Sequence, residues 1–270
     1  MQITRIALIA FSPCTTTLAS LRAVGDGLGK ALALPVTEHD LTLPESRAGL
    51  YAFGPSELVV FGFPVYGGRL PRTAPEIFAA VRGNATPAVL AAVYGNRDYE
   101  DALLEMQREA ESRGFIPFAA TAPVAEHCME RSVAAGRPDA QDKDLLARFG
   151  EAAANHIREL ASPADAAFTA PGVFPYRKEI NQAACAPKAP EGCTRCGSCA
   201  AVCPTGAIVA ATPETADDAA CIRCMACVNT CPESARKPMI ETFPQITAWL
   251  RENCAKRREP EFFPEACIPG

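Results

Sequence analysis

One cysteine spacing occurs twice in this 270-residue chain and limits how its C-terminal half is organised. Both copies have the form C-x2-C-x2-C-x3-C-P, and they end at Pro204 and Pro232. The cysteines are Cys193, Cys196, Cys199 and Cys203 in the first copy, and Cys221, Cys224, Cys227 and Cys231 in the second. Three closely spaced thiolates can surround one metal cluster, while the turn that begins at the proline carries the fourth cysteine past it. The array therefore predicts metal–sulfur chemistry.

The array resembles that of bacterial two-cluster ferredoxins, in which it holds [4Fe–4S] clusters and the fourth cysteine of each run binds the other cluster. The resemblance implies two [4Fe–4S] clusters with crossed ligands. The implied ligand sets are Cys193, Cys196, Cys199 and Cys231 for one cluster, and Cys221, Cys224, Cys227 and Cys203 for the other.

Zinc and disulfides remain as alternatives for these cysteines. A zinc ribbon uses pairs of C-x2-C and has no use for a third cysteine at the same spacing. A disulfide framework requires an oxidising compartment. Outside the array, Cys185 is a candidate extra ligand, and Cys14 is either a small filler or a reactive thiol whose pKa a helix start lowers.

Composition narrows the class of protein further. The hydrophobic fraction of 49% and the charged fraction of 21% are ordinary for a soluble globular chain. A net charge of −5 provides no basic stripe for nucleic acid and suits docking to basic patches on redox partner proteins. No stretch approaches the ~20 apolar residues of a membrane span, and the short apolar N-terminus does not read as a signal peptide. We expect a cytoplasmic protein.

The first part of the chain alternates short apolar runs with amphipathic, helix-like stretches. The runs are Ile3–Phe11, a weaker one at Leu34–Thr37, Leu58–Pro64, Pro87–Tyr94 and Phe115–Val124. Continuous apolar runs of this length are typical of strands buried on both faces of a parallel sheet. The pattern predicts an α/β fold with a doubly wound, five-stranded parallel sheet, closed by a helix at Asp144–Leu160.

Four regions follow from this organisation. Residues 1–162 form the α/β domain, and the Pro- and Ala-rich residues 163–190 form a connector. Residues 191–240 form a small α+β domain around the cysteines. Residues 241–270 begin with a helix at Phe243–Lys256 and end in a tail without a readable pattern.

Three loops lie where strands of the α/β domain end, which is where doubly wound sheets bind ligands. The loop after the first strand carries Ser12, Thr15, Thr16 and Thr17, hydroxyls at a helix start that suit a phosphate. The other two place aromatic rings beside glycines; they contain Pro64, Val65, Tyr66 and Gly67, and Gly95, Asn96, Asp98 and Tyr99.

Here the chain resembles a flavodoxin, and with the cysteine array it is similar to fused flavodoxin–ferredoxin proteins of anaerobic bacteria and archaea. The resemblance implies FMN, with its phosphate at Ser12, Thr15, Thr16 and Thr17. One face of the flavin would lie along Pro64, Val65, Tyr66 and Gly67. Gly95, Asn96, Asp98 and Tyr99 would cover the other face and the ring edge. Flavodoxins usually carry Thr-Gly in the phosphate loop, where this chain has Cys14-Thr15.

These features favour an electron carrier that relays electrons between FMN, two [4Fe–4S] clusters and external redox partner proteins. A second hypothesis is a flavin-dependent reductase of a small quinone-like, nitro or oxygen acceptor. A third is that the first domain is an empty scaffold for a homodimer. No catalytic residue is assigned, since His39, His127 and His156 are isolated. Arg195 and Arg223 each stand directly before the second cysteine of their run. They either raise the reduction potential of the clusters or are solvated surface residues.

Overall fold

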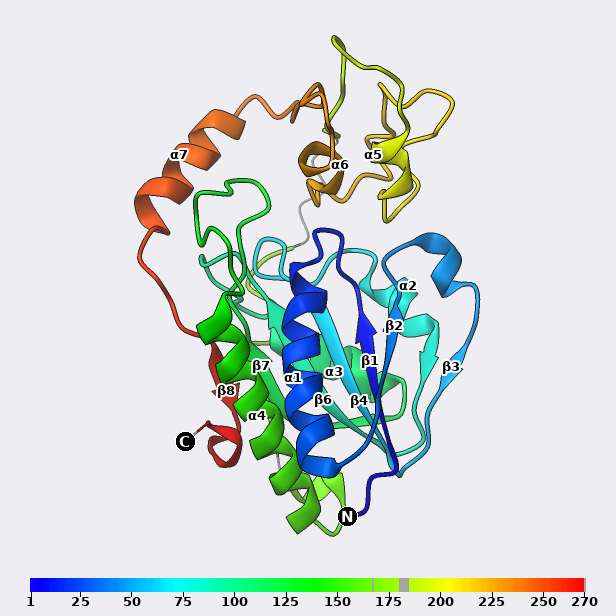
Figure 1. The fold of residues 1–270 in the computed structure, drawn as a ribbon, viewed down its shortest axis with the longest axis vertical. Helices are drawn as coiled ribbons and strands as arrows, with labels where there is room; N and C mark the ends of the chain where they lie inside the picture. The colour runs from blue at the N-terminus through cyan, green and yellow to red at the C-terminus, as the bar shows by residue number, and fades with distance from the viewer. Residues whose placement is uncertain (167, 180–184, 270) are drawn as a thin grey trace.

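The fold was analysed in a computed structural model, which describes residues 1–166, 168–179 and 185–269. A large α/β domain lies below a small cysteine-rich domain, which sits at the end of the sheet where β1 and its neighbours end (Figure 1). The predicted connector 163–190 and tail 241–270 lie partly outside the described residues. Within those residues, no helix is both long enough and apolar enough to cross a bilayer.

The central sheet has the strand order β2-β1-β4-β6-β7-β8. Its strands are β1 (Arg5–Ala10), β2 (Val36–Asp40), β4 (Glu57–Pro64), β6 (Thr86–Val93), β7 (Phe115–Ala122) and β8 (Glu261–Phe263). The first five are parallel, and their order is the 2-1-3-4-5 order of flavodoxin-like doubly wound folds. The predicted fold class is therefore confirmed.

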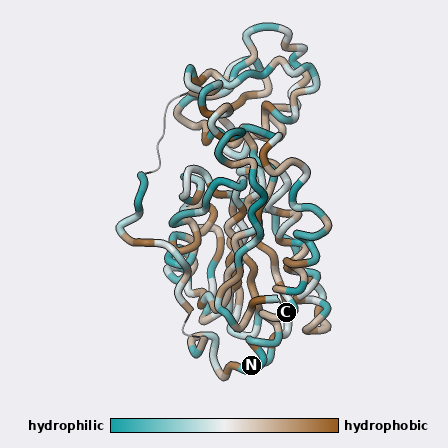
Figure 2. Tube along the Cα trace, turned by 90° about the vertical axis from the view of Figure 1, so that its left-hand side faces the viewer, coloured by the Kyte–Doolittle hydropathy of each residue, from teal (hydrophilic) through white to brown (hydrophobic). Residues whose placement is uncertain are grey.

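Both faces of this sheet are buried, because its strands alternate their side chains between two apolar cores. Along β1, Ala7 and Ile9 face one core, whereas Ile6 and Leu8 face the other. The first core contains residues of α2 (Ala74–Ala79) and α3 (Ala102–Ser112). The second contains residues of α1 (Thr16–Leu32) and α4 (Ala140–Glu159). The apolar strands run through the middle of the domain (Figure 2).

The C-terminal tail completes the sheet, which its sequence did not predict. β8 pairs antiparallel with β7, with Phe263 opposite Ala120, and the Phe262 ring stacks on Phe149 of α4. Between the small domain and β8 lies α7 (Phe243–Asn253), close to the helix predicted there. Leu250 of this helix is buried, whereas Trp249 is exposed, so the helix packs on the protein along only part of its surface.

The remaining elements are short. β3 (Tyr51–Ala52) and β5 (Val81–Arg82) form a separate two-stranded sheet. Three 3-10 helices span Pro44–Arg47, Pro163–Ala166 and Glu265–Cys267. In the small domain, α5 (Ser198–Ala201) and α6 (Ala226–Asn229) follow the second cysteine of each run. The described part of the connector packs on α3, since the amide of Ala170 donates a 2.6 Å hydrogen bond to Gln107.

Candidate functional site

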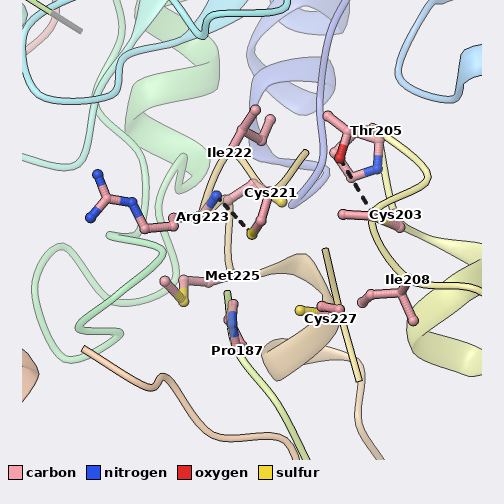
Figure 3. Close-up of a pocket in the computed structure, with 13 residues that line it drawn as sticks. Pro187, Cys203, Thr205, Ile208, Cys221, Ile222, Arg223, Met225 and Cys227 are labelled. Atoms are coloured by element: carbon pink, nitrogen blue, oxygen red, sulfur yellow. Dashed lines mark hydrogen bonds between the residues drawn. The ribbon is translucent and has the colours of Figure 1, made fainter. Parts of the chain in front are cut away.

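The eight cysteines of the array divide between two hollows in the small domain. The first cysteine hollow is lined by Cys193, Cys196, Cys199 and Cys231. The second cysteine hollow is lined by Cys203, Cys221, Cys224 and Cys227. Figure 3 shows Cys203, Cys221 and Cys227 around the second hollow, beside the apolar Ile208 and Ile222. Each hollow thus brings together three cysteines of one run and the fourth of the other.

The two cysteine runs have the same backbone conformation around their second cysteine. Arg195 and Gly197 have φ of 57° and 79°, and the matching Arg223 and Met225 have φ of 55° and 63°. Left-handed residues alternating with right-handed ones turn successive N–H groups toward one side, which suits anionic sulfur. One such group, the amide of Arg223, donates a 3.3 Å hydrogen bond to the sulfur of Cys221 (Figure 3).

The spacing of the cysteine side chains is also unlike that of a site for a single metal ion. No three His, Cys, Asp or Glu residues in the described ranges converge closely enough to hold one metal ion. The cysteines instead surround a space, which is the arrangement a multi-atom cluster requires. The chemistry and placement of these donors therefore fit an iron–sulfur cluster in each hollow.

A buried arginine that sequence reasoning missed holds the loops around both hollows. Arg236 is 2% exposed and donates hydrogen bonds to the carbonyls of Pro187, Pro213 and Thr215 at 2.8, 3.0 and 2.7 Å. No sequence pattern marks it, because its partners are backbone atoms. Arg195 is a solvated surface residue, one of the two alternatives for it: it pairs with Glu214 at 2.5 Å, and its side chain is 62% exposed.

Among the cavities formed by the described residues at the carboxyl end of the sheet, two adjoin the predicted flavin-binding loops. The strand-end hollow is bounded by the β1–α1 loop, the ends of β4 and β6, and residues 125–128. The interdomain cavity, of about 360 Å³, is lined by residues 65–67 and 127–129 from the α/β domain and by Cys221, Ile222 and Arg223 from the small domain. Val65, Tyr66, His127 and Cys128 line both cavities, so the two are adjacent.

The structure brings together part of the predicted flavin-binding set. Thr16, Thr17, Pro64, Val65, Tyr66 and Gly95 line the strand-end hollow, and Gly67 lines the interdomain cavity. Gly67 and Gly68 have φ of 66° and 86°, which only glycine adopts readily, and the turn they form pairs Tyr66 with Arg69. This turn holds Tyr66 between the two cavities.

The other predicted residues have local roles in the structure. Ser12 is buried and accepts a 3.0 Å hydrogen bond from the amide of Leu18, so it holds the loop to α1. Thr15 lies at the loop surface with a φ of 65°, where flavodoxins usually carry glycine. Its amide and that of Thr16 donate to the carbonyls of Ser12 and Cys14.

The loop after β6 is covered by the C-terminal segment. The Asn96 side chain donates to the carbonyls of Cys254 and Lys256 at 2.7 and 2.9 Å. Tyr99 donates a 2.8 Å hydrogen bond to Glu261, and Asp98 lies 4.0 Å from Arg258. These three side chains do not line either cavity within the described residues.

Residues 125–129, to which the sequence assigned no site role, line the two cavities. The ring of His127 lies against Gly95, where an added Cβ would come within 2.5 Å of it. Burial lowers the pKa of His127 to about 4, with a contribution from the charge of Arg97, so the ring is neutral at pH 7. Burial raises the pKa of the neighbouring Cys128 to about 12.

Cys14 is not the activated thiol that a helix start would produce. Burial is the largest influence on it and raises its pKa, outweighing a lowering contribution from Asn229. Its thiol instead contacts the small domain: it donates to the carbonyl of Cys224 and lies 3.8 Å from the side-chain amide of Asn229 in α6. Cys185 lies outside both cysteine hollows.

Comparisons with known proteins agree with this division of the chain. Residues 185–232 match the family model of a 4Fe-4S dicluster domain. No protein with a curated description matches the chain in sequence.

Solved structures similar to the chain include an archaeal flavodoxin, with 12% identity and a TM-score of 0.38 over 58% of this chain and all of that one. The two-electron reduced flavodoxin of Megasphaera elsdenii has 13% identity and a TM-score of 0.35, over 56% of this chain and 98% of that one. An NAD(P)H:quinone oxidoreductase of Methanothermobacter marburgensis has 13% identity and a TM-score of 0.32, over 59% and 98%. The fold assignment itself rests on the strand order.

The chain is a fusion of a flavodoxin-like α/β domain with a ferredoxin-like 4Fe–4S dicluster domain. The dicluster match supports electron-transfer chemistry as the class of activity.

Proposed function

We propose that this protein is an electron carrier that binds FMN beside the sheet and two [4Fe–4S] clusters in the cysteine hollows. It relays electrons between these groups and external redox proteins. The observation that carries the proposal is the interdomain cavity, which is lined by Tyr66 and its neighbours on one side and by Cys221, Ile222 and Arg223 on the other.

The interdomain cavity suits a flat ring system. Its volume of about 360 Å³ falls within the roughly 300–1,000 Å³ usual for small-ligand sites. Val65, Leu70 and Ile222 supply apolar walls, while Arg72 and Arg223 add positive charge. A ring held there would contact both domains and lie near these two cations.

The strand-end hollow suits the phosphate end of the same ligand. Thr16 and Thr17 line it from the first turn of α1, a helix of 17 residues whose N-terminus attracts anions. The amides of Thr15 and Thr16 are used within the loop, so we expect the hydroxyls rather than these amides to hold the phosphate.

The cysteine hollows suit the clusters, with the crossed sets of four cysteines as ligands. FMN can hold one or two electrons and a [4Fe–4S] cluster exchanges one, so the bound groups would convert between single-electron and two-electron traffic. Arg236 places a buried positive charge beside both hollows, which favours a more negative, reduced cluster in each.

The test is to measure iron, acid-labile sulfide and FMN on protein purified without oxygen. The proposal predicts about eight irons and one FMN per chain, with flavin and cluster absorption both bleached by dithionite. Iron without flavin, even after incubation with excess FMN, would contradict the FMN part. Steady reduction of a small quinone faster than the clusters are reoxidised would favour a reductase instead.

A further inference from the structure

The two cysteine hollows differ in their relation to the α/β domain. Among the described residues, polar contacts from the α/β domain reach Pro204, Ala219, Cys224 and Asn229 of the small domain, all of which lie in or near the segments around the second cysteine hollow. Arg47 donates a 2.9 Å hydrogen bond to the carbonyl of Pro204, and Arg72 donates to that of Ala219. The second cysteine hollow therefore faces the sheet.

Burial follows the same division. Cys203, Cys224 and Cys227 of the second hollow are 8%, 7% and 8% exposed. Cys221, the fourth cysteine of the second hollow, is partly exposed. In the first hollow Cys196 is exposed and its three companions are partly exposed. A cluster in the second hollow would thus be held by more deeply buried cysteines than one in the first, where Cys196 is open to solvent.

Distance also separates the first hollow from the proposed flavin. The interdomain cavity includes Cys221, Ile222 and Arg223 of the second run, and its described lining includes none of the first run. An electron passing between the cavity and the first hollow would travel through the second. The second hollow is therefore the inner position and the first hollow the outer one.

We propose that external redox proteins dock on the exposed face of the first cysteine hollow, around Cys196, and that electrons enter and leave the protein there. This inference rests on the proposed electron-carrier function and adds an order: partner, outer cluster, inner cluster, flavin. Each exchange at this face moves one electron between the outer cluster and one centre of the partner. No bond forms or breaks.

The charge of this face indicates the kind of partner. Glu191 and Glu233 are exposed beside Cys193 and Cys231, and the nearby Glu214 is ion-paired with Arg195. Because Arg236, which also lines this hollow, is buried, the three carboxylates outnumber the one exposed guanidinium and make the face acidic. We therefore expect a partner with a basic surface around its redox centre, because complementary charge raises the association rate.

Stopped-flow reduction of mitochondrial cytochrome c, a basic haem protein, tests the docking face. The protein is first reduced with dithionite and freed of excess reductant. Glu233→Lys should slow haem reduction at low salt by about threefold or more, and high salt should remove the difference. The matched control is Glu252→Lys on α7, an exposed glutamate that lies on the other side of α6 from α5 (Figure 1).

The control should leave the haem-reduction rate unchanged. An unchanged rate in Glu233→Lys, or equal slowing by both variants, would overturn the docking face. Iron, sulfide and FMN are measured on every preparation, so the two proposals fail separately. Iron-loaded protein without FMN contradicts the proposed flavin, while the cytochrome rates still show where electrons leave the clusters.

Discussion

The thiol of Cys14 donates a 3.2 Å hydrogen bond to the backbone carbonyl of Cys224, which is 210 positions away in the chain. Cys14 belongs to the loop that follows β1, and Cys224 is the second cysteine of the second run. This contact joins the loop proposed to hold a cofactor phosphate to the backbone around the inner cysteine hollow. It places the two proposed redox centres beside each other.

The crossed pairing of the cysteines can be tested by counting iron in double variants. Cys203 and Cys227 line the same hollow, so Cys203→Ser with Cys227→Ser should remove one cluster and leave about half of the iron. Cys203 and Cys199 line different hollows, so their double variant should lose nearly all of it. The opposite pattern would show uncrossed ligands. Cys185→Ser, outside both hollows, is the control.

The packing of α1 on α4 depends on a glycine. A Cβ at Gly27 would lie 1.8 Å from the backbone carbonyl oxygen of Ala147, so the helices would have to separate. Gly27→Ala should lower the free energy of unfolding by about 1–3 kcal/mol in urea titrations, the usual cost of overpacking. Gly49→Ala has open space around its Cβ and should change stability little. Equal stability of the two variants would contradict this account of the helix contact.

Asn96 holds the C-terminal segment through three hydrogen bonds. Its amide donates to the carbonyls of Cys254 and Lys256, and its oxygen accepts from the amide of Arg258 at 3.1 Å. Asn96→Ala should lower the free energy of unfolding by at least about 2 kcal/mol, because buried backbone groups lose their partners. Asn155→Ala, at an exposed position on α4, provides the comparison. If Asn96→Ala lowers FMN affinity at unchanged stability, Asn96 acts in binding instead.

His127 should make stability depend on pH. Its pKa is about 4 in the folded protein against about 6.5 when unfolded, so the unfolded chain binds more protons between these values. The free energy of unfolding should therefore fall as pH drops below about 6.5, by about 3 kcal/mol in total at pH 4. His127→Asn keeps an acceptor for the amides of Met129 and Glu130 and should reduce this loss. If His127→Asn leaves the pH dependence of the free energy of unfolding unchanged, His127 is not the source of that dependence.

The sequence by itself determined the fold class and the region of metal–sulfur chemistry. Runs such as Leu58–Pro64 are apolar without alternation, which suits strands covered on both faces, and β4 occupies nearly the same residues. The cysteine spacing is equally local: the three-residue intervals in Cys221, Cys224 and Cys227 are enough to place these side chains around one hollow. Apolar runs and cysteine spacings can be predicted from the sequence because residues close together in the chain form them.

Tertiary structure decided which segments surround the proposed flavin. Asn96 and Tyr99 occupy a loop at the correct end of a strand, but the C-terminal segment reaches them from more than 150 positions away and takes up their hydrogen bonds. His127 and Cys128, from a segment with no motif, line the strand-end hollow. The three-residue strand β8 and the buried Arg236 are likewise stabilised by distant backbone groups. Contacts between distant segments depend on how the whole chain packs, and no local spacing of residues records them.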